Sequence, residues 1–190
     1  MNQKTRNMVG TGILTAIVIV LQAMAVGIRF GTFSITLVLV PIVVGAALYG
    51  AWSGAWLGLI FGVVVLFTDS AAFMAISVPG TVITVLLKGI LAGLAAGLVY
   101  KLIENKNRFI AVISSAVTCA VVNTGVFLLG CTVFFMDTIK TWSEGAGYDN
   151  AGTYMILGLV GVNFLVELGV NIVLSSAVVR ILNVIKKTNK

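Results

Sequence analysis

Two ionisable side chains stand inside long apolar stretches of this chain. Lys88 lies in the stretch 81–101, and Glu167 lies in the stretch 154–185. Three amide side chains accompany them, namely Asn123, Asn163 and Asn171. Placing a charge at the centre of a bilayer costs about 2.5–3.5 kcal/mol on insertion scales, so such residues mark either a buried pair or a site.

These residue types suit binding better than catalysis. Lys88 and Glu167 could pair with each other while the asparagines hydrogen-bond between helices, or all of them could line a pocket for a solute. Both interpretations stay open at this point. An ammonium suits an anionic group such as a carboxylate, whereas Glu167 would accept from a hydroxyl or an amine.

Other catalytic machinery is sparse in the sequence. The chain has no histidine, and the spacing of Cys119 and Cys131 matches no zinc or redox motif, so we expect both cysteines to pack inside helices. One deep carboxylate and one lysine are thin support for an enzyme. We therefore expect no enzyme, no metal and no cofactor, and a chain without a phosphate-binding loop cannot hydrolyse ATP by that route.

The composition indicates a membrane protein. Of 190 residues, 59% are apolar and 9% are charged, against about 45–50% and about 25% in soluble domains. The net charge of +6 is carried by short clusters between apolar runs, which argues against a nucleic-acid partner. We expect membrane lipid around a single integral membrane domain that covers residues 1–190.

The apolar runs predict an all-α bundle of six transmembrane helices. The six predicted segments are 10–28, 37–50, 53–68, 81–101, 109–134 and 154–185. The second and third fall short of the roughly 20 residues of a full span, and they form either a tight helical hairpin or one long bent unit. Pro41 is expected to kink or start the second segment.

The basic residues predict the orientation. They gather before the first segment, between the fourth and fifth, and at the end of the chain, as Lys4, Arg6, Lys101, Lys106, Arg108, Arg180, Lys186, Lys187 and Lys190. An even number of spans places all three clusters on one side, and the positive-inside rule makes that side, with both termini, cytoplasmic. A signal peptide ending near Ala23-Met24-Ala25 is the competing interpretation of the first stretch.

The deep polar residues lie at similar predicted depths. At 1.5 Å per residue, Lys88 lies about 10 Å, Asn123 about 15 Å, Asn163 about 14 Å and Glu167 about 20 Å below the outer surface. Asn163, Glu167 and Asn171 are four residues apart and share one helix face. This pattern favours a polar pocket that opens to the outside.

The outer loops add three candidate binding residues, Arg29, Trp142 and Tyr148. The polar stretch 137–153 is expected to be a loop that covers the pocket, although its aromatic residues could instead anchor at the headgroups. Few aromatic residues fall in the outer halves of the predicted spans, which argues against a large flat ring as the solute.

Small residues four apart predict close helix contacts. They occur as Gly54, Gly58 and Gly62, and as Gly93 and Gly97. Gly12 and Ala16 form a further pair near the cytoplasmic end of the first helix, where the face could also meet a partner chain.

The whole chain resembles a known family. The stretch 33–50, with Pro41, and the small-residue stretch 52–59 resemble the second and third helices of the substrate-binding S component of energy-coupling factor (ECF) vitamin transporters. Lys88-Gly89 and the region 163–169 resemble pocket-forming helices of such proteins. The family often has Gly-Pro where this chain has Gly50-Ala51.

The resemblance implies a function. Such proteins bind a vitamin at the outer side of a bacterial cell membrane, and they assemble with a transmembrane coupling protein and two ATP-binding subunits. Gly12 and Ala16 match the positions that meet the coupling protein. Pantothenate is the first candidate substrate, with pyridoxine, riboflavin and thiamine open. A stand-alone carrier or channel and a small membrane enzyme are the alternatives.

Overall fold

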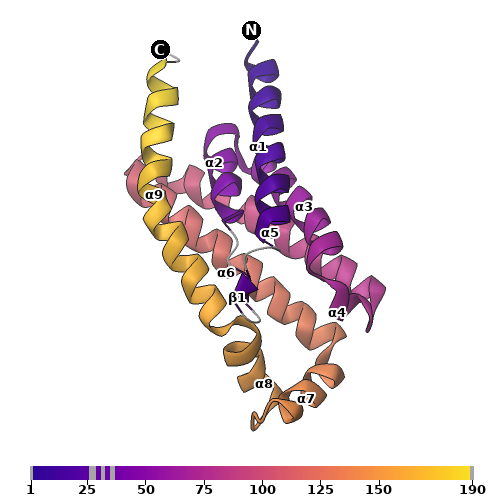
Figure 1. Cartoon of the computed structure of the whole chain (residues 1–190). Helices are drawn as coiled ribbons and strands as arrows, with labels where there is room; N and C mark the ends of the chain where they lie inside the picture. The colour runs from indigo at the N-terminus through magenta and orange to yellow at the C-terminus, as the bar shows by residue number, and fades with distance from the viewer. Residues whose placement is uncertain (1, 26–28, 31–32, 35–36, 189–190) are drawn as a thin grey trace.

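The computed structural model describes residues 2–25, 29–30, 33–34 and 37–188, and it shows an all-α bundle (Figure 1). Among these residues, five helices are long and apolar enough to cross a membrane. They are α1 (Gln3–Ala25), α3 (Ala51–Thr68), α5 (Val78–Ile103), α6 (Arg108–Phe134) and α9 (Val162–Thr188). The shorter elements are β1 (Arg29–Phe30), β2 (Phe33–Ser34), α2 (Leu39–Tyr49), α4 (Ala71–Met74), α7 (Met136–Gly145), α8 (Ala151–Thr153) and the π-helix η1 (Tyr154–Gly161).

The second predicted span is only a short helix. The 11 residues of α2 extend about 16 Å, roughly half the hydrocarbon core of a bilayer. Its side chains are apolar because they pack inside the protein, where Leu39 and Ile42 join Val18, Leu57 and Phe61 in the main core. The start of α1 and the end of α9 lie at the same end of the bundle (Figure 1), so α2 returns the chain between α1 and α3.

One glycine forms the corner between α2 and α3. α2 ends at Tyr49, α3 begins at Ala51, and Gly50 between them has a φ of 95°. That backbone region is costly for any residue with a Cβ. The pair is therefore a tight hairpin rather than one long bent helix. Pro41 lies in the first turn of α2, where its missing N–H costs no helical hydrogen bond.

Side-chain caps set where the next two helices begin. The Ser77 hydroxyl accepts the N–H of Gly80 at 3.2 Å, so α5 starts three residues before the predicted boundary. Asn107 Oδ1 accepts the N–H groups of Phe109 and Ile110 at 2.9 and 3.1 Å, and α6 starts there.

Two predictions for the outer connections and the last span are wrong in detail. The stretch expected to be a covering loop contains the helix α7, which packs onto the bundle through the buried Ile139. The last predicted span is divided into η1 and α9. Cys119 and Cys131 are both free and buried, as the sequence predicts.

Backbone contact between α3 and α5 forms the closest helix pair of the bundle. A Cβ added to Gly58 would collide with the carbonyl oxygen of Gly89, and one added to Gly54 would collide with that of Gly93. A Cβ added to Gly62 would likewise lie only 2.8 Å from the carbonyl oxygen of Val85. We call Gly54, Gly58, Gly62, Gly89 and Gly93 the glycine seam. Their close contact fixes the position of α3 along α5.

The glycine seam predicts an asymmetry between two glycine substitutions. Gly58→Ala should lower the free energy of unfolding by about 1–3 kcal/mol, because overpacking pushes the two backbones apart. Gly125→Ala on α6 is the matched control, since an added Cβ meets no atom within 4 Å there among the described residues. Thermal unfolding in detergent measures both, and equal melting temperatures would contradict the close contact.

Candidate functional site

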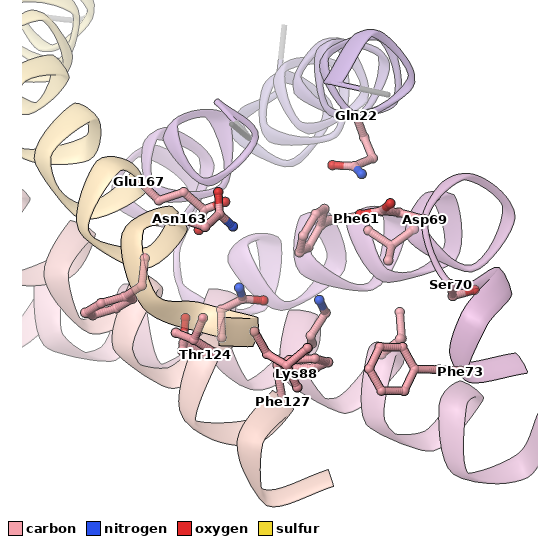
Figure 2. Close-up of a pocket in the computed structure, with 16 residues that line it drawn as sticks. Gln22, Phe61, Asp69, Ser70, Phe73, Lys88, Thr124, Phe127, Asn163 and Glu167 are labelled. Carbon is pink, nitrogen blue, oxygen red and sulfur yellow. The ribbon is translucent and has the colours of Figure 1, made fainter. Parts of the chain in front are cut away.

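A cavity of about 260 Å³ lies among the long helices (Figure 2). Its walls come from α1, α3, α4, α5, α6, η1 and α9. The residues that line it are Gln22, Phe61, Val65, Asp69, Ser70, Phe73, Val85, Lys88, Asn123, Thr124, Phe127, Leu159, Val160, Asn163, Phe164 and Glu167. Polar and aromatic side chains are thus mixed in one enclosed space.

Lys88 projects into this cavity between two aromatic rings. Its ammonium nitrogen lies 5.6 Å from the centroid of the Phe61 ring and 5.4 Å from that of the Phe127 ring. Both distances fall within the roughly 6 Å over which an aromatic face attracts a cation. The glycine seam sets this geometry, because Lys88 precedes Gly89 on α5 and Phe61 follows Gly58 on α3 by one turn. The rings hold the ammonium from the sides and consume none of its three N–H donors.

Two carboxylates share the cavity with Lys88. Glu167 of α9 is 6% exposed, and Asp69 is exposed at the C-terminal end of α3. Both side chains line the cavity into which Lys88 projects. Figure 2 shows the two carboxylates on different sides of the cavity. The site therefore offers both signs of charge to a bound molecule.

Three buried amide oxygens in the cavity lack hydrogen-bond partners among the described residues. They are Gln22 Oε1, Asn123 Oδ1 and Asn163 Oδ1. A buried polar atom without a partner costs about 1–3 kcal/mol. These three atoms around one space are acceptors that a hydrogen-bond donor in the cavity could reach.

Aromatic rings form part of the cavity wall. Phe73 of α4 packs edge-to-face on Phe127, Phe135 and Trp142, with centroids 5.6, 5.0 and 5.6 Å apart. Phe164 of α9 also lines the space. The sequence-based expectation of few aromatic residues near the pocket is wrong, because phenylalanines from four different helices meet here only after folding.

The structure brings four of the eight predicted binding residues together, namely Lys88, Asn123, Asn163 and Glu167. Asn171 lies on α9 with Asn163 and Glu167 but outside the lining. Its amide nitrogen donates to the backbone carbonyl of Glu167 at 2.8 Å.

The remaining three predicted residues come from the outer connections. Trp142 stands behind Phe73, and Tyr148 packs on Tyr154 with ring centroids 5.3 Å apart, so neither lines the cavity. Arg29 belongs to β1, and its side chain lies outside the part of the chain that the structure describes.

Sequence reasoning missed Gln22, Asp69 and the aromatic lining. Gln22 could have been predicted as a site residue from the sequence, because it is an amide inside the apolar stretch of α1. Asp69 and Ser70 directly follow the apolar run of α3. The phenylalanines carried no signal, since most aromatic residues in a membrane helix face lipid or core.

The sequence pattern of one protein family, described as the substrate-specific component of ECF transporters, matches residues 6–179. This match spans nearly the whole chain and includes every helix that lines the cavity. The chain belongs to this family. No curated protein and no solved structure matches it. The protein is thus the substrate-specific membrane subunit of an ECF importer.

The predicted partner face of this S component lies away from the cavity. Gly12 and Ala16 are exposed on α1, and nothing would lie within 4 Å of a Cβ added to Gly12 among the described residues. Gly12 borders a groove of about 630 Å³ that Trp52 and Trp56 of α3 also line. Trp56 donates its indole N–H to the Thr15 hydroxyl at 3.2 Å.

The ring contacts predict an energetic coupling between Lys88 and Phe127. In a double-mutant cycle with Lys88→Met and Phe127→Leu, we expect an interaction free energy of about 0.5–2 kcal/mol in unfolding experiments. Phe109→Leu on the same helix is the control, because its side chain is 48% exposed, and it should show no coupling to Lys88. A Phe127 coupling no larger than that of Phe109 would show that the rings do not hold the ammonium.

Proposed function

We propose that this S component captures a small water-soluble vitamin that carries a carboxylate, with pantothenate as the first candidate. The observation that carries the proposal is the Lys88 ammonium, held between Phe61 and Phe127 inside a cavity with three unpartnered amide oxygens. A carboxylate is the group that a fixed ammonium binds best. We infer from the positive-inside rule that this end of the bundle faces the outside of a bacterial cell membrane.

The size and donor pattern of the cavity support a compact substrate. A volume of about 260 Å³ is at the lower limit of the roughly 300–1,000 Å³ of small-molecule sites. Pantothenate offers two hydroxyl groups and one amide N–H, which equals the number of unpartnered amide oxygens. Glu167 adds an acceptor for a hydroxyl. Riboflavin, with three fused rings, is the least suited of the four candidates by size.

The aromatic lining keeps two ring-containing candidates in consideration. Phe73 and Phe164 line the cavity beside the two rings that flank Lys88. Pyridoxine and thiamine could stack on them, but both lack a carboxylate. Binding of either without pantothenate would mean that Lys88 serves Glu167 rather than the substrate.

We further infer that this subunit works with a transmembrane coupling protein and two ATP-binding subunits that supply energy. Support comes from its family and from the exposed small-residue face of Gly12 and Ala16, which lies on the helix end remote from the cavity. Uptake of pantothenate into liposomes by this chain alone would instead favour a stand-alone carrier.

Replacing Lys88 tests the binding proposal. The wild type should release pantothenate on denaturation in native mass spectrometry, or bind it in equilibrium dialysis beside pyridoxine, thiamine and riboflavin. Lys88→Met should lower the affinity by on the order of 30-fold or more, the loss of about 2 kcal/mol of charge pairing. Lys101→Met, an exposed lysine at the other end of the same helix, should bind normally. A wild-type affinity in Lys88→Met would sink the proposal.

Substitution of the α1 face tests the partner proposal. Gly12→Leu with Ala16→Leu should abolish co-purification with the coupling protein, because the larger side chains keep the two surfaces apart. Pantothenate binding should stay at the wild-type level, since neither residue lines the cavity. Gly125→Leu places the same side chain on the open face of α6 and should leave assembly intact. Normal assembly of the double variant would show that the Gly12 and Ala16 face does not contact the coupling protein.

A further inference from the structure

We propose that Gln22 contacts the substrate and that this contact ties α1 to the occupied cavity. The inference rests on the proposed function, because it concerns the same cavity. Gln22 is 2% exposed, and its side chain points into the cavity in Figure 2. Its Oε1 atom finds no hydrogen-bond partner among the described residues.

The position of Gln22 on α1 is unsuited to a purely structural role. The buried residues of α1 are Val18, Gln22 and Ala25, which lie on one face of the helix. An apolar side chain would fill the middle of that stripe without leaving an amide oxygen unpartnered. The glutamine therefore lowers the stability of the empty protein, and a bound donor would offset that loss.

Gln22 is also placed to connect a loosely held helix to the others. In its apolar stretch α1 is 17% buried, against 39% for α3 and for α5. Among the described elements α1 packs chiefly on α2 and α3. Lys88, Asn123 and Glu167 belong to α5, α6 and α9. A molecule bound to these residues and to Gln22 would bridge α1 to the far wall of the cavity.

The expected consequence is that occupancy orders α1. A hydrogen bond from the substrate to Oε1 would restrain the helix near residue 22, and a helix transmits that restraint along its axis. Backbone amides of α1 should then exchange more slowly in the occupied protein. Loss of the Gln22 contact should remove this effect while the substrate still protects α5.

The test compares Gln22→Leu with Gln3→Leu, the other glutamine of the same helix, which is exposed. The probe is pantothenate, with pyridoxine, thiamine and riboflavin run in parallel. Gln22→Leu should bind about tenfold more weakly, as expected for the loss of one hydrogen bond. At saturating probe, hydrogen exchange of the α1 amides should slow in the wild type and in Gln3→Leu. In Gln22→Leu, exchange should slow in α5 but not in α1.

A second readout needs no bound molecule. Without any probe, Gln22→Leu should melt at or above the wild-type Tm, because it removes an unpartnered amide. A clearly lower Tm would assign Gln22 a structural role and overturn the inference, whatever the four compounds do. Unchanged affinity, or α1 protection that persists in Gln22→Leu, would overturn it as well. If the wild type binds none of the four compounds, the vitamin proposal fails on its own, and the Tm comparison still decides the role of Gln22.

Discussion

The backbone contact between α3 and α5 determines how the side chains of the cavity are placed. Gly58 and Gly89 leave no room for a Cβ, so the two helices are held at one depth and one rotation. This places Phe61 beside Lys88 and turns the ammonium toward the space that α6 and α9 enclose. A membrane protein cannot rely on a hydrophobic driving force between helices, and close packing of small residues supplies the attraction instead. The position of Lys88 relative to Phe61 thus depends on glycines, which let the two helices approach closely.

The cavity is held at a cost in stability that the proposed function would explain. Lys88 lies between two ring faces and shares the cavity with Glu167, yet three amide oxygens around it remain unpartnered among the described residues. An apolar core of the same shape would be more stable. A subunit that must recognise a polar solute within the membrane has to keep its acceptors available until that solute arrives. Substrate binding and the stability of the protein are therefore linked through the same atoms.

The sequence predicted much of the fold, and half of the predicted binding residues line one cavity, for identifiable reasons. Hydropathy located the long helices, and the cost of burying charge singled out Lys88 and Glu167, whose depths along their helices agree with a common cavity. Hydropathy did not fix the depth of the short helix α2, because an apolar helix inside the protein and one inside lipid have the same composition. It also missed Phe61, Phe73 and Phe127, since which face of a helix turns inward depends on packing between distant segments.

The most direct test of whether Lys88 binds the substrate is a crystal structure of the protein with pantothenate, or with whichever vitamin it carries through purification. We expect density for the ligand within the cavity, with its carboxylate at hydrogen-bonding distance from Lys88 Nζ. Its hydrogen-bond donors should face the amide oxygens of Asn123 and Asn163. Density in the groove beside Trp52 and Trp56, or a closed cavity in which Lys88 is fully paired with Glu167 and Asp69, would contradict it.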